Sequence, residues 1–165
     1  MTLRVSKILL VAAVAVFYTL VVFNNATDYG SNYQFVHHVL LMDSTFPDNH
    51  GMWRAIHPAF AHAVFYDGII GWETLTTVLC WLGVILLSRA LTAPAVVFNK
   101  AKRVSIIALT IGLLLWFVAF ITVGGEWFLM WQSKIWNGQE AAFRSFASIG
   151  IVLLLLIMPD TAEQP

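Results

Sequence analysis

Hydrophobic residues along this chain gather in four long runs that are separated by more polar connections. The runs cover about residues 5–23, 69–91, 104–123 and 142–158 of the 165. Because a helix needs about 20 mostly apolar residues to cross the hydrocarbon of a bilayer, each run is long enough for one span. The pattern predicts an all-α membrane protein, a four-transmembrane-helix bundle with connections at 24–68, 92–103 and 124–141.

The connection of residues 24–68 is too long to be a bare link between two helices. Between Asn32 and Asp43, its apolar residues recur at the spacings of three and four that suit a helix. Pro58 stands where a helix leading into the second span would begin. We therefore expect a helical connection between the first two spans, and a second span whose helix starts outside the bilayer.

Small and polar residues mark one face of the second run and one face of the third. In lipid, small residues favour helix association because they let two backbones approach closely. On the third run, spacings of three and four connect Ser105, Ala108, Gly112, Leu115, Ala119, Thr122 and Glu126. The matching face of the second span, including the helix expected to lead into it, holds His62, Tyr66, Glu73, Thr77 and Cys80, with Thr76 and Gly83 beside it. We expect these two faces to pack together.

Composition supports a single integral membrane domain over residues 1–165, because 59% of the residues are hydrophobic and 11% are charged. Nine basic and nine acidic residues give no net charge. The chain therefore lacks the basic field that nucleic-acid binding needs. Cys80 is the only cysteine, which excludes an internal disulfide and a relay of paired thiols.

The basic residues predict how the bundle is oriented. Six lie near the start of the chain or around the connection of residues 92–103: Arg4, Lys7, Arg89, Lys100, Lys102 and Arg103. Three belong to the other two connections or their borders: Arg54, Lys134 and Arg144. Basic residues favour the cytoplasmic side, so we expect both termini in the cytoplasm and the connections 24–68 and 124–141 outside. The first run also resembles a signal peptide, but no small-x-small cleavage site follows it, and we expect it to be retained.

Ionisable residues near the outer ends of the runs form a candidate polar cluster. If the second span enters the bilayer near residue 69, Glu73 lies about 6 Å inside it. Ionisable groups at this depth usually face the bundle interior. We expect Glu126 and Arg144 to reach a similar depth and meet Glu73, with His62 on the same helix face. Three interpretations stay open: an ion-paired clamp, an acid without a full partner that exchanges protons or holds a polar ligand, and separate snorkelling into headgroup water.

The connection of residues 124–141 contains three of the seven tryptophans and several amides. Indole rings favour the headgroup level, which predicts an aromatic belt. The amides favour an alternative, a structured cap over a cavity, formed by Trp127, Trp131, Gln132, Trp136, Asn137 and Gln139. The spacings of the five histidines do not place two on one helix face, so we expect neither a metal nor another cofactor.

The same connection carries a family resemblance. Residues 124–139 fit Gly-Gly-Glu-Trp-Phe-x-Met-Trp-Gln-Ser-x-x-Trp-Asn-Gly-Gln, which resembles a bacterial family of predicted small integral membrane proteins of unknown function. The likeness extends to Trp72-Glu73, Trp53–Ile56 and Ala141–Arg144, and so covers most of the chain. The resemblance implies a multi-pass protein of the bacterial inner membrane, with the outer connections in the periplasm. It implies no activity.

Three functions remain as hypotheses. The sequence contains no nucleophile–base pair, phosphate loop or paired cysteines, which favours a protein without enzymatic activity. Beyond the lipid bilayer itself, we expect it to bind a membrane-protein partner, or a second copy of itself, through its outer cap, or to stabilise an assembly. The alternative is a redox accessory that handles a quinone, haem or lipid in a Trp-lined pocket beside Glu73, Glu126 and His62. The third is movement of protons or ions through an oligomer.

Overall fold

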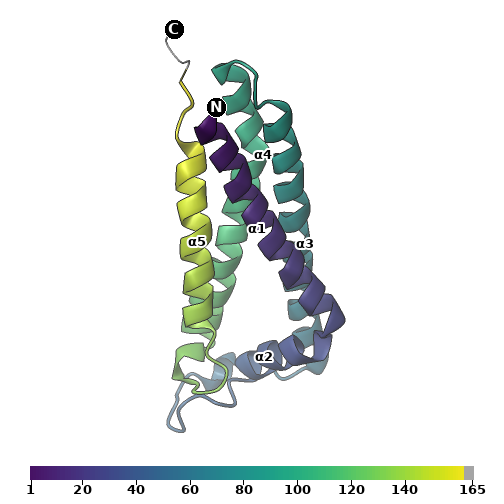
Figure 1. Cartoon of the computed structure of the whole chain (residues 1–165). Helices are drawn as coiled ribbons and strands as arrows, with labels where there is room; N and C mark the ends of the chain where they lie inside the picture. Colours follow the sequence, from purple (N-terminus) through teal and green to yellow (C-terminus); the bar gives the residue numbers. More distant parts are fainter. Residues whose placement is uncertain (162–165) are drawn as a thin grey trace.

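The computed structural model describes residues 1–161, which form helices and connections and contain no β-strand. Four rods run along the molecule (Figure 1). They are α1 (Thr2–Thr27), α3 (Ala59–Arg89), α4 (Ala95–Leu114) with its continuation η2 (Leu115–Trp127), and α5 (Gln139–Ile157). Each is long and apolar enough to cross a membrane, and the four predicted runs fall on these four rods. The prediction of an all-helical chain with four spans is confirmed.

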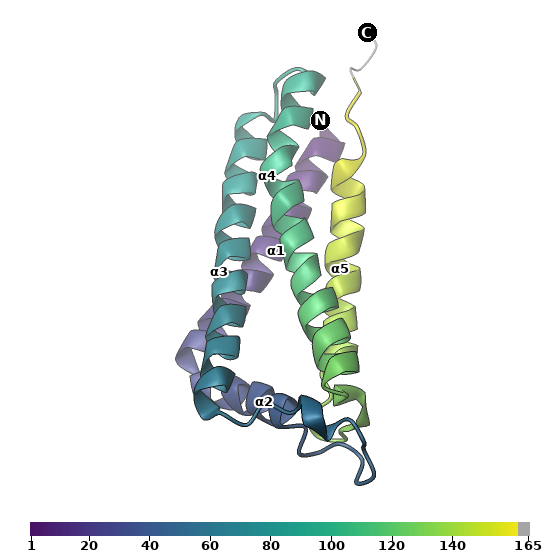
Figure 2. The same ribbon diagram turned by 180° about the vertical axis from the view of Figure 1, so that it is seen from behind.

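The connection after α1 is helical, as the spacing of its apolar residues predicts. The chain turns sharply at Asp28 and continues as α2 (Tyr29–Leu41), which lies across the end of the bundle (Figure 2). A short 3-10 helix, η1 (Met52–Arg54), follows, and α3 begins at Ala59, directly after Pro58. The helix of the second span therefore starts well before residue 69, as expected.

The two ends of the bundle differ. The start of α1, the residues that follow α5 up to residue 161 and the turn between α3 and α4 lie at one end, which we call the terminal end (Figure 1). At the opposite end, which we call the α2 end, lie α2, η1 and the short 3-10 helix η3 (Met130–Gln132). One short turn, between α3 and α4, joins spans at the terminal end. Most of the connecting chain therefore lies at the α2 end.

Close approach of small residues joins α3 to α4. A Cβ atom placed on Gly83 would lie 3.1 Å from the Cα of Ser105. One placed on Gly112 would lie 3.0 Å from the Cγ2 of Thr76. Tyr18 of α1 adds a hydrogen bond of 2.8 Å from its hydroxyl to the carbonyl oxygen of Gly112. The predicted packing between the small-residue faces of the second and third runs is confirmed for this half of the bundle.

The backbone of the third span changes from an α-helix to a π-helix at Leu115. In a π-helix the N–H of each residue donates to the carbonyl five residues earlier, as the N–H of Phe128 does to Val123 at 3.0 Å. Each turn then holds more residues than the 3.6 of an α-helix, so the inward-facing positions shift. Gly124 and Gly125 are buried, whereas Glu126 is exposed. The expectation that the inner face continues through Glu126 is therefore wrong.

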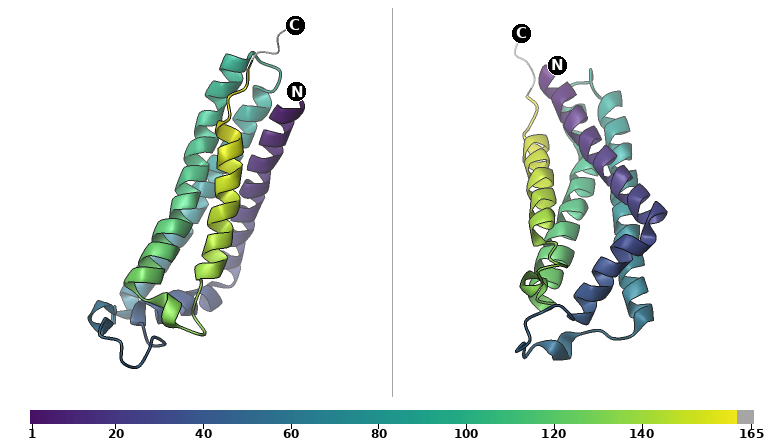
Figure 3. Two further views of the ribbon diagram at one scale, coloured as in Figure 1. Left: turned by 90° about the vertical axis from the view of Figure 1, so that its left-hand side faces the viewer. Right: turned by 60° about the horizontal axis from the view of Figure 1, so that its bottom comes forward.

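Helix α1 runs obliquely and gives the bundle its shape. It starts beside α5 at the terminal end and finishes beside α3 at the α2 end (Figure 1). Two further views show α1 meeting α2 at a sharp corner, with α2 bridging back toward η2 and α5 (Figure 3). The rods therefore diverge toward the α2 end, and side chains of α2 enter the space between them.

Candidate functional site

Glu73 is an acid buried inside the bundle, on the inward face of α3. Its side chain is 2% exposed. The side-chain amide of Asn25, in the last turn of α1, donates a hydrogen bond of 2.6 Å to its Oε2. This bond forms because the oblique course of α1 brings its end against α3.

The orientation of the Asn25 amide follows from its neighbours. Its Oδ1 accepts a hydrogen bond of 2.8 Å from the Nδ2 of Asn32 and one of 3.2 Å from the hydroxyl of Tyr66. An amide oxygen accepts and an amide nitrogen donates, so the Nδ2 of Asn25 has to face Glu73. The arrangement links α1, α2 and α3 and leaves Glu73 as the final acceptor of a small polar network.

Glu73 has no cationic partner among residues 1–161. The ion pairs of this part of the chain lie elsewhere, and the hydrogen bond from Asn25 is the one contact of its carboxylate with a donor. Burying an ionisable group without a partner is costly, and such groups inside membrane helices usually serve a function. Oε1 of Glu73 is therefore available to a further hydrogen-bonding group.

A cavity of about 330 Å³ lies beside Glu73. Its polar lining comes from the Glu73 network and its neighbours, Asn24, Asn25, Asn32 and Tyr66. The other lining side chains are apolar or small: Val21, Phe35, Val36, Ile69, Trp116, Phe120, Gly138 and Ala141. The cavity thus presents one polar wall in an otherwise apolar space, an arrangement typical of small-molecule sites.

A second cavity of about 440 Å³ adjoins the first. Phe35, Val36, Ile69 and Phe120 line both, and the rings of Phe35 and Phe120 stack with their centroids 6.3 Å apart. All other residues around the second cavity are also apolar, and they come from α2, α3, η2 and the segment after η2. Together the two cavities provide a polar region beside Glu73, which we call the polar pole, and a larger apolar space next to the Phe35–Phe120 pair.

The expected meeting of Glu73, Glu126 and Arg144 does not occur. Glu126 is exposed near the end of η2, because the π-helix turns it away from the inner face. Arg144 is also exposed, and its guanidinium lies 3.8 Å from the carboxylate of Glu140, one turn earlier on α5. Ala142 occupies the buried position in that turn of α5. The expected clamp of two acids and one arginine is therefore wrong.

His62 is completely buried, but it belongs to a different group of residues. Its Nε2 lies 2.7 Å from the carbonyl oxygen of Ile56, and its Nδ1 lies 2.8 Å from the Nδ1 of His37. A carbonyl only accepts, so Nε2 of neutral His62 carries the hydrogen and the Nδ1 of His37 donates. Burial, followed by the nearby His62, lowers the pKa of His37 below its ordinary value. This pair fastens α2 to the start of α3.

The expected cap residues pack mainly against α2 and the connection that follows it. Trp136 stacks on His38 with a centroid distance of 4.6 Å. Gln132 accepts a hydrogen bond of 3.1 Å from the backbone N–H of Phe46, whose ring meets that of Trp131 edge to face. Of the remaining members, Trp127 lies against the guanidinium of Arg54, Asn137 accepts a hydrogen bond from the backbone N–H of Gln139, and the side chain of Gln139 lies close to Gly125.

None of the six cap residues lines either of the two cavities near Glu73. The aromatic side chains that do so are Phe35, Trp116, Phe120 and others of the spans and α2. The alternative of a pocket beside Glu73 lined by the cap tryptophans is therefore wrong. Sequence reasoning missed Asn25 and Asn32 as site residues; the one signal for Asn25 was its place directly after the first apolar run.

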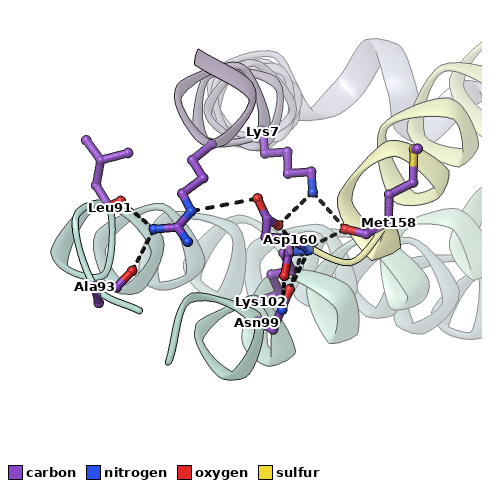
Figure 4. A network of polar contacts seen from close by, with 8 residues as sticks. Lys7, Leu91, Ala93, Asn99, Lys102, Met158 and Asp160 are labelled. Carbon is purple, nitrogen blue, oxygen red and sulfur yellow. Dashed lines mark hydrogen bonds and ion pairs between the residues drawn. The ribbon is translucent and has the colours of Figure 1, made fainter. Parts of the chain in front are cut away.

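A second polar group at the terminal end was also missed. Asp160 follows the last span and binds Lys7 of α1 at 2.8 Å and Lys102 of α4 (Figure 4). Both ammonium groups also donate to the carbonyl oxygen of Met158. Burial alone would raise the pKa of Asp160, but the hydrogen bonds and charges of Lys102 and Lys7 hold it below its ordinary value. The group ties the chain after α5 to α1 and α4.

Comparison with known proteins agrees with this architecture. A model of the family described as "Predicted small integral membrane protein (DUF2165)" matches residues 3–159. No curated protein and no solved structure matches the chain. The matched range includes Glu73 and all four apolar rods except Thr2, the first residue of α1. The chain therefore belongs to this family of predicted small integral membrane proteins.

Proposed function

We propose that this protein binds a membrane-soluble ligand of the quinone or lipid class, with its polar head beside Glu73 and its apolar body in the adjoining cavity. The observation that carries the proposal is the buried carboxylate of Glu73, which has no cationic partner among residues 1–161 and lines a cavity with otherwise mostly apolar walls. Sites for small molecules combine few polar groups with a large apolar lining in the same way.

The polar pole can recognise a head group in two ways. An ionised Glu73 accepts a hydrogen bond from a hydroxyl or amine, whereas a protonated Glu73 donates one to a carbonyl oxygen. Asn25 holds Oε2, which leaves Oε1 for the ligand. Either contact would relieve the cost of burying the acid.

Access from the bilayer fits the position of the first cavity. Its lining includes Val21 of α1 and Ala141 of α5, and Ala141 is exposed. We infer that the cavity opens between these two membrane-spanning helices. An apolar molecule dissolved in the bilayer would enter sideways, without crossing water.

A bulky residue at this opening tests the proposal. Ala141→Trp would narrow the cavity from an exposed position, and Ser148→Trp adds the same ring to an exposed site farther along α5. We expect lipid extracts of the protein purified in mild detergent to contain a bound quinone, or a bound lipid other than an anionic phospholipid, in the wild type and Ser148→Trp. Ala141→Trp should reduce it at least about tenfold, which corresponds to about 1.4 kcal/mol of binding free energy. Equal amounts in both variants would contradict the proposal.

We further propose that the protein lies in the bacterial inner membrane with the terminal end in the cytoplasm and the α2 end in the periplasm. The excess of basic residues at the terminal end supports this orientation. Asp48→Cys would place a thiol on an exposed loop of the α2 end, while Cys80 is buried. A membrane-impermeant maleimide should label this variant in intact spheroplasts. Labelling only after lysis would indicate the opposite orientation, with the α2 end in the cytoplasm.

Binding of a protein partner through the α2 end is a second candidate. Trp53 is 72% exposed, and its ring meets the half-exposed ring of Trp127 edge to face, with Arg54 against both rings. Exposed tryptophan and arginine are typical of residues that dominate interfaces. Cross-linking in membranes that contain either the wild type or Trp53→Ala tests this candidate. Binding of a partner at Trp53 predicts a cross-linked adduct with the wild type and none with Trp53→Ala. Proton or ion movement through an oligomer stays a prediction.

A further inference from the structure

Three cations surround one carboxylate at the terminal end of the bundle. Lys7 and Lys102 bind Asp160 directly, and the Nε of Arg4 lies 3.8 Å from its Oδ1. The four side chains are between 2% and 16% exposed, so water screens them only partly. Three positive charges against one negative charge leave this group of residues with a positive excess. Such an excess attracts an anion.

The hydrogen-bond donors of the three cations are used to different extents. Lys102 directs its three N–H groups to Asn99, Met158 and Asp160. Lys7 has two such contacts, with Met158 and Asp160. Arg4 uses Nη1, which donates to the carbonyl oxygens of Leu91 at 2.9 Å and Ala93 at 2.6 Å. One N–H of Lys7 and the Nη2 group of Arg4 therefore remain without a hydrogen-bond acceptor among residues 1–161, although the Arg4 guanidinium lies over the ring of Phe98.

These donors lie at a cavity of about 770 Å³. Arg4, Lys7 and Asp160 line it, whereas Lys102 does not. Its other walls include Leu10 of α1 and Leu155 of α5, which belong to the membrane spans. The cavity thus joins a positively charged region at the end of the spans to an apolar surface that continues into the bilayer.

An anionic phospholipid combines the same two features, a phosphate at the membrane surface and acyl chains below it. We propose that this cavity binds the phosphate of an anionic phospholipid, with Arg4 and Lys7 donating to its oxygens and acyl chains along Leu10 and Leu155. Arginine suits a phosphate because its planar group can donate two parallel hydrogen bonds. Lys102 and Asp160 act as positioning residues that hold Lys7 and the chain after α5. This site is independent of the cavity beside Glu73.

Lipid titration of the whole protein in detergent tests the proposal. Phosphatidylglycerol, phosphatidylcholine and inorganic phosphate are added separately, and the unfolding temperature is read from tryptophan fluorescence. Phosphatidylglycerol should raise the midpoint, because a ligand that binds only the folded state stabilises it. Phosphatidylcholine and inorganic phosphate at equal concentration should not. Native mass spectrometry should show one phosphatidylglycerol retained per chain.

Two variants with the same change of charge separate this site from general surface attraction. Arg4→Gln removes a cavity cation, and Lys100→Gln removes an exposed cation at the same end that does not line the cavity. We expect Arg4→Gln to weaken phosphatidylglycerol binding at least about tenfold, about 1.4 kcal/mol, while Lys100→Gln leaves it unchanged. Leu155→Trp, which fills the cavity without changing charge, should also weaken binding if Arg4→Gln does not fold.

Several results would overturn the proposal. Equal weakening by Arg4→Gln and Lys100→Gln would show diffuse attraction to the surface. An equal effect of inorganic phosphate would assign the cavity to a small anion. Binding that survives in Leu155→Trp, or no preference for phosphatidylglycerol over phosphatidylcholine, would exclude a lipid in this cavity.

Discussion

Asn25 and Glu73 form a buried hydrogen bond of 2.6 Å between the end of α1 and the middle of α3. The bond fixes both residues, because Asn25 is itself held by Asn32 and Tyr66. It leaves Glu73 with one donor and no cation among residues 1–161. The pairing therefore places an acid at a cavity wall, where Oε2 accepts a hydrogen bond from Asn25 and Oε1 has no donor among residues 1–161.

Removing the amide of Asn25 should destabilise the bundle. Hydrogen bonds to charged groups contribute about 1.5–3 kcal/mol, and we expect Asn25→Ala to lower the free energy of unfolding by about that amount. The measurement is an unfolding titration with a denaturing detergent in mixed micelles. Asn24→Ala changes the neighbouring exposed amide and should cost less than about 0.5 kcal/mol. Equal losses of unfolding free energy would show that the Asn25–Glu73 hydrogen bond does not stabilise the bundle more than the exposed amide of Asn24 does.

The close contact of α3 with α4 predicts a pair of compensating substitutions. Gly83→Ala would place a methyl group against the side chain and the Cα of Ser105, at 3.1 Å from the latter. Overpacking of this kind costs about 1–3 kcal/mol. Ser105→Gly removes the side chain that the methyl group meets. We expect the double variant to recover most of the loss, and simple additivity of the two single losses would contradict this packing.

The His37–His62 pair predicts that stability at the α2 end depends on pH. The pKa of His37 is lowered from its ordinary value of 6.5, first by burial and then by His62 and His38, whereas Asp43 acts in the opposite direction. The unfolded state therefore binds more protons just below pH 6.5, so this stabilisation is complete above pH 6.5 and is lost as the pH falls.

Hydrogen exchange of α2 between pH 8 and pH 5 measures this effect after correction for the intrinsic exchange rate. We expect protection of Tyr29–Leu41 to fall below pH 6.5 in the wild type. His37→Asn removes the titrating group, and its protection should depend less on pH. An identical pH profile in the variant would assign the effect to another residue.

Asp160 is expected to stabilise the terminal end. Asp160→Asn would leave Lys102, which is 2% exposed, and Lys7 without a counter-charge. Breaking a buried ion pair by removing one partner costs about 3–5 kcal/mol. The same unfolding titration measures the loss, with Asp48→Asn on an exposed loop as the control. A loss no larger than that of the control would show that the two lysines do not depend on Asp160.

The helices and the contact between α3 and α4 could be predicted because they depend on local patterns. Run length specifies a membrane helix, and the spacing of Gly83, Ser105 and Gly112 specifies a face that packs closely. The helix after Pro58 was likewise predictable from the residue that precedes it. In each case, the residues that predict a helix or its packing face lie within the sequence of that helix or directly before it.

The site was only partly predictable because it depends on geometry that no single segment determines. Glu73 could be identified as a buried acid, but its partner Asn25 depends on the oblique course of α1. Glu126 was misplaced because a helical period of 3.6 does not hold in the π-helix of η2. The Asp160 group joins residues from both ends of the chain, a contact that sequence spacing does not reveal.

The most direct test of a ligand site at Glu73 compares the ligand content of two acid-to-amide variants. Glu73→Gln keeps the size of the side chain and an oxygen that can accept from Asn25, while Glu126→Gln makes the same change at an exposed acid near the same end. Bound quinone, or bound lipid other than an anionic phospholipid, is measured per mole of purified protein by mass spectrometry. We predict at least about a tenfold loss in Glu73→Gln and no loss in Glu126→Gln, the former equivalent to about 1.4 kcal/mol. Equal ligand content in the two variants, or no ligand in the wild type, would contradict a site at Glu73.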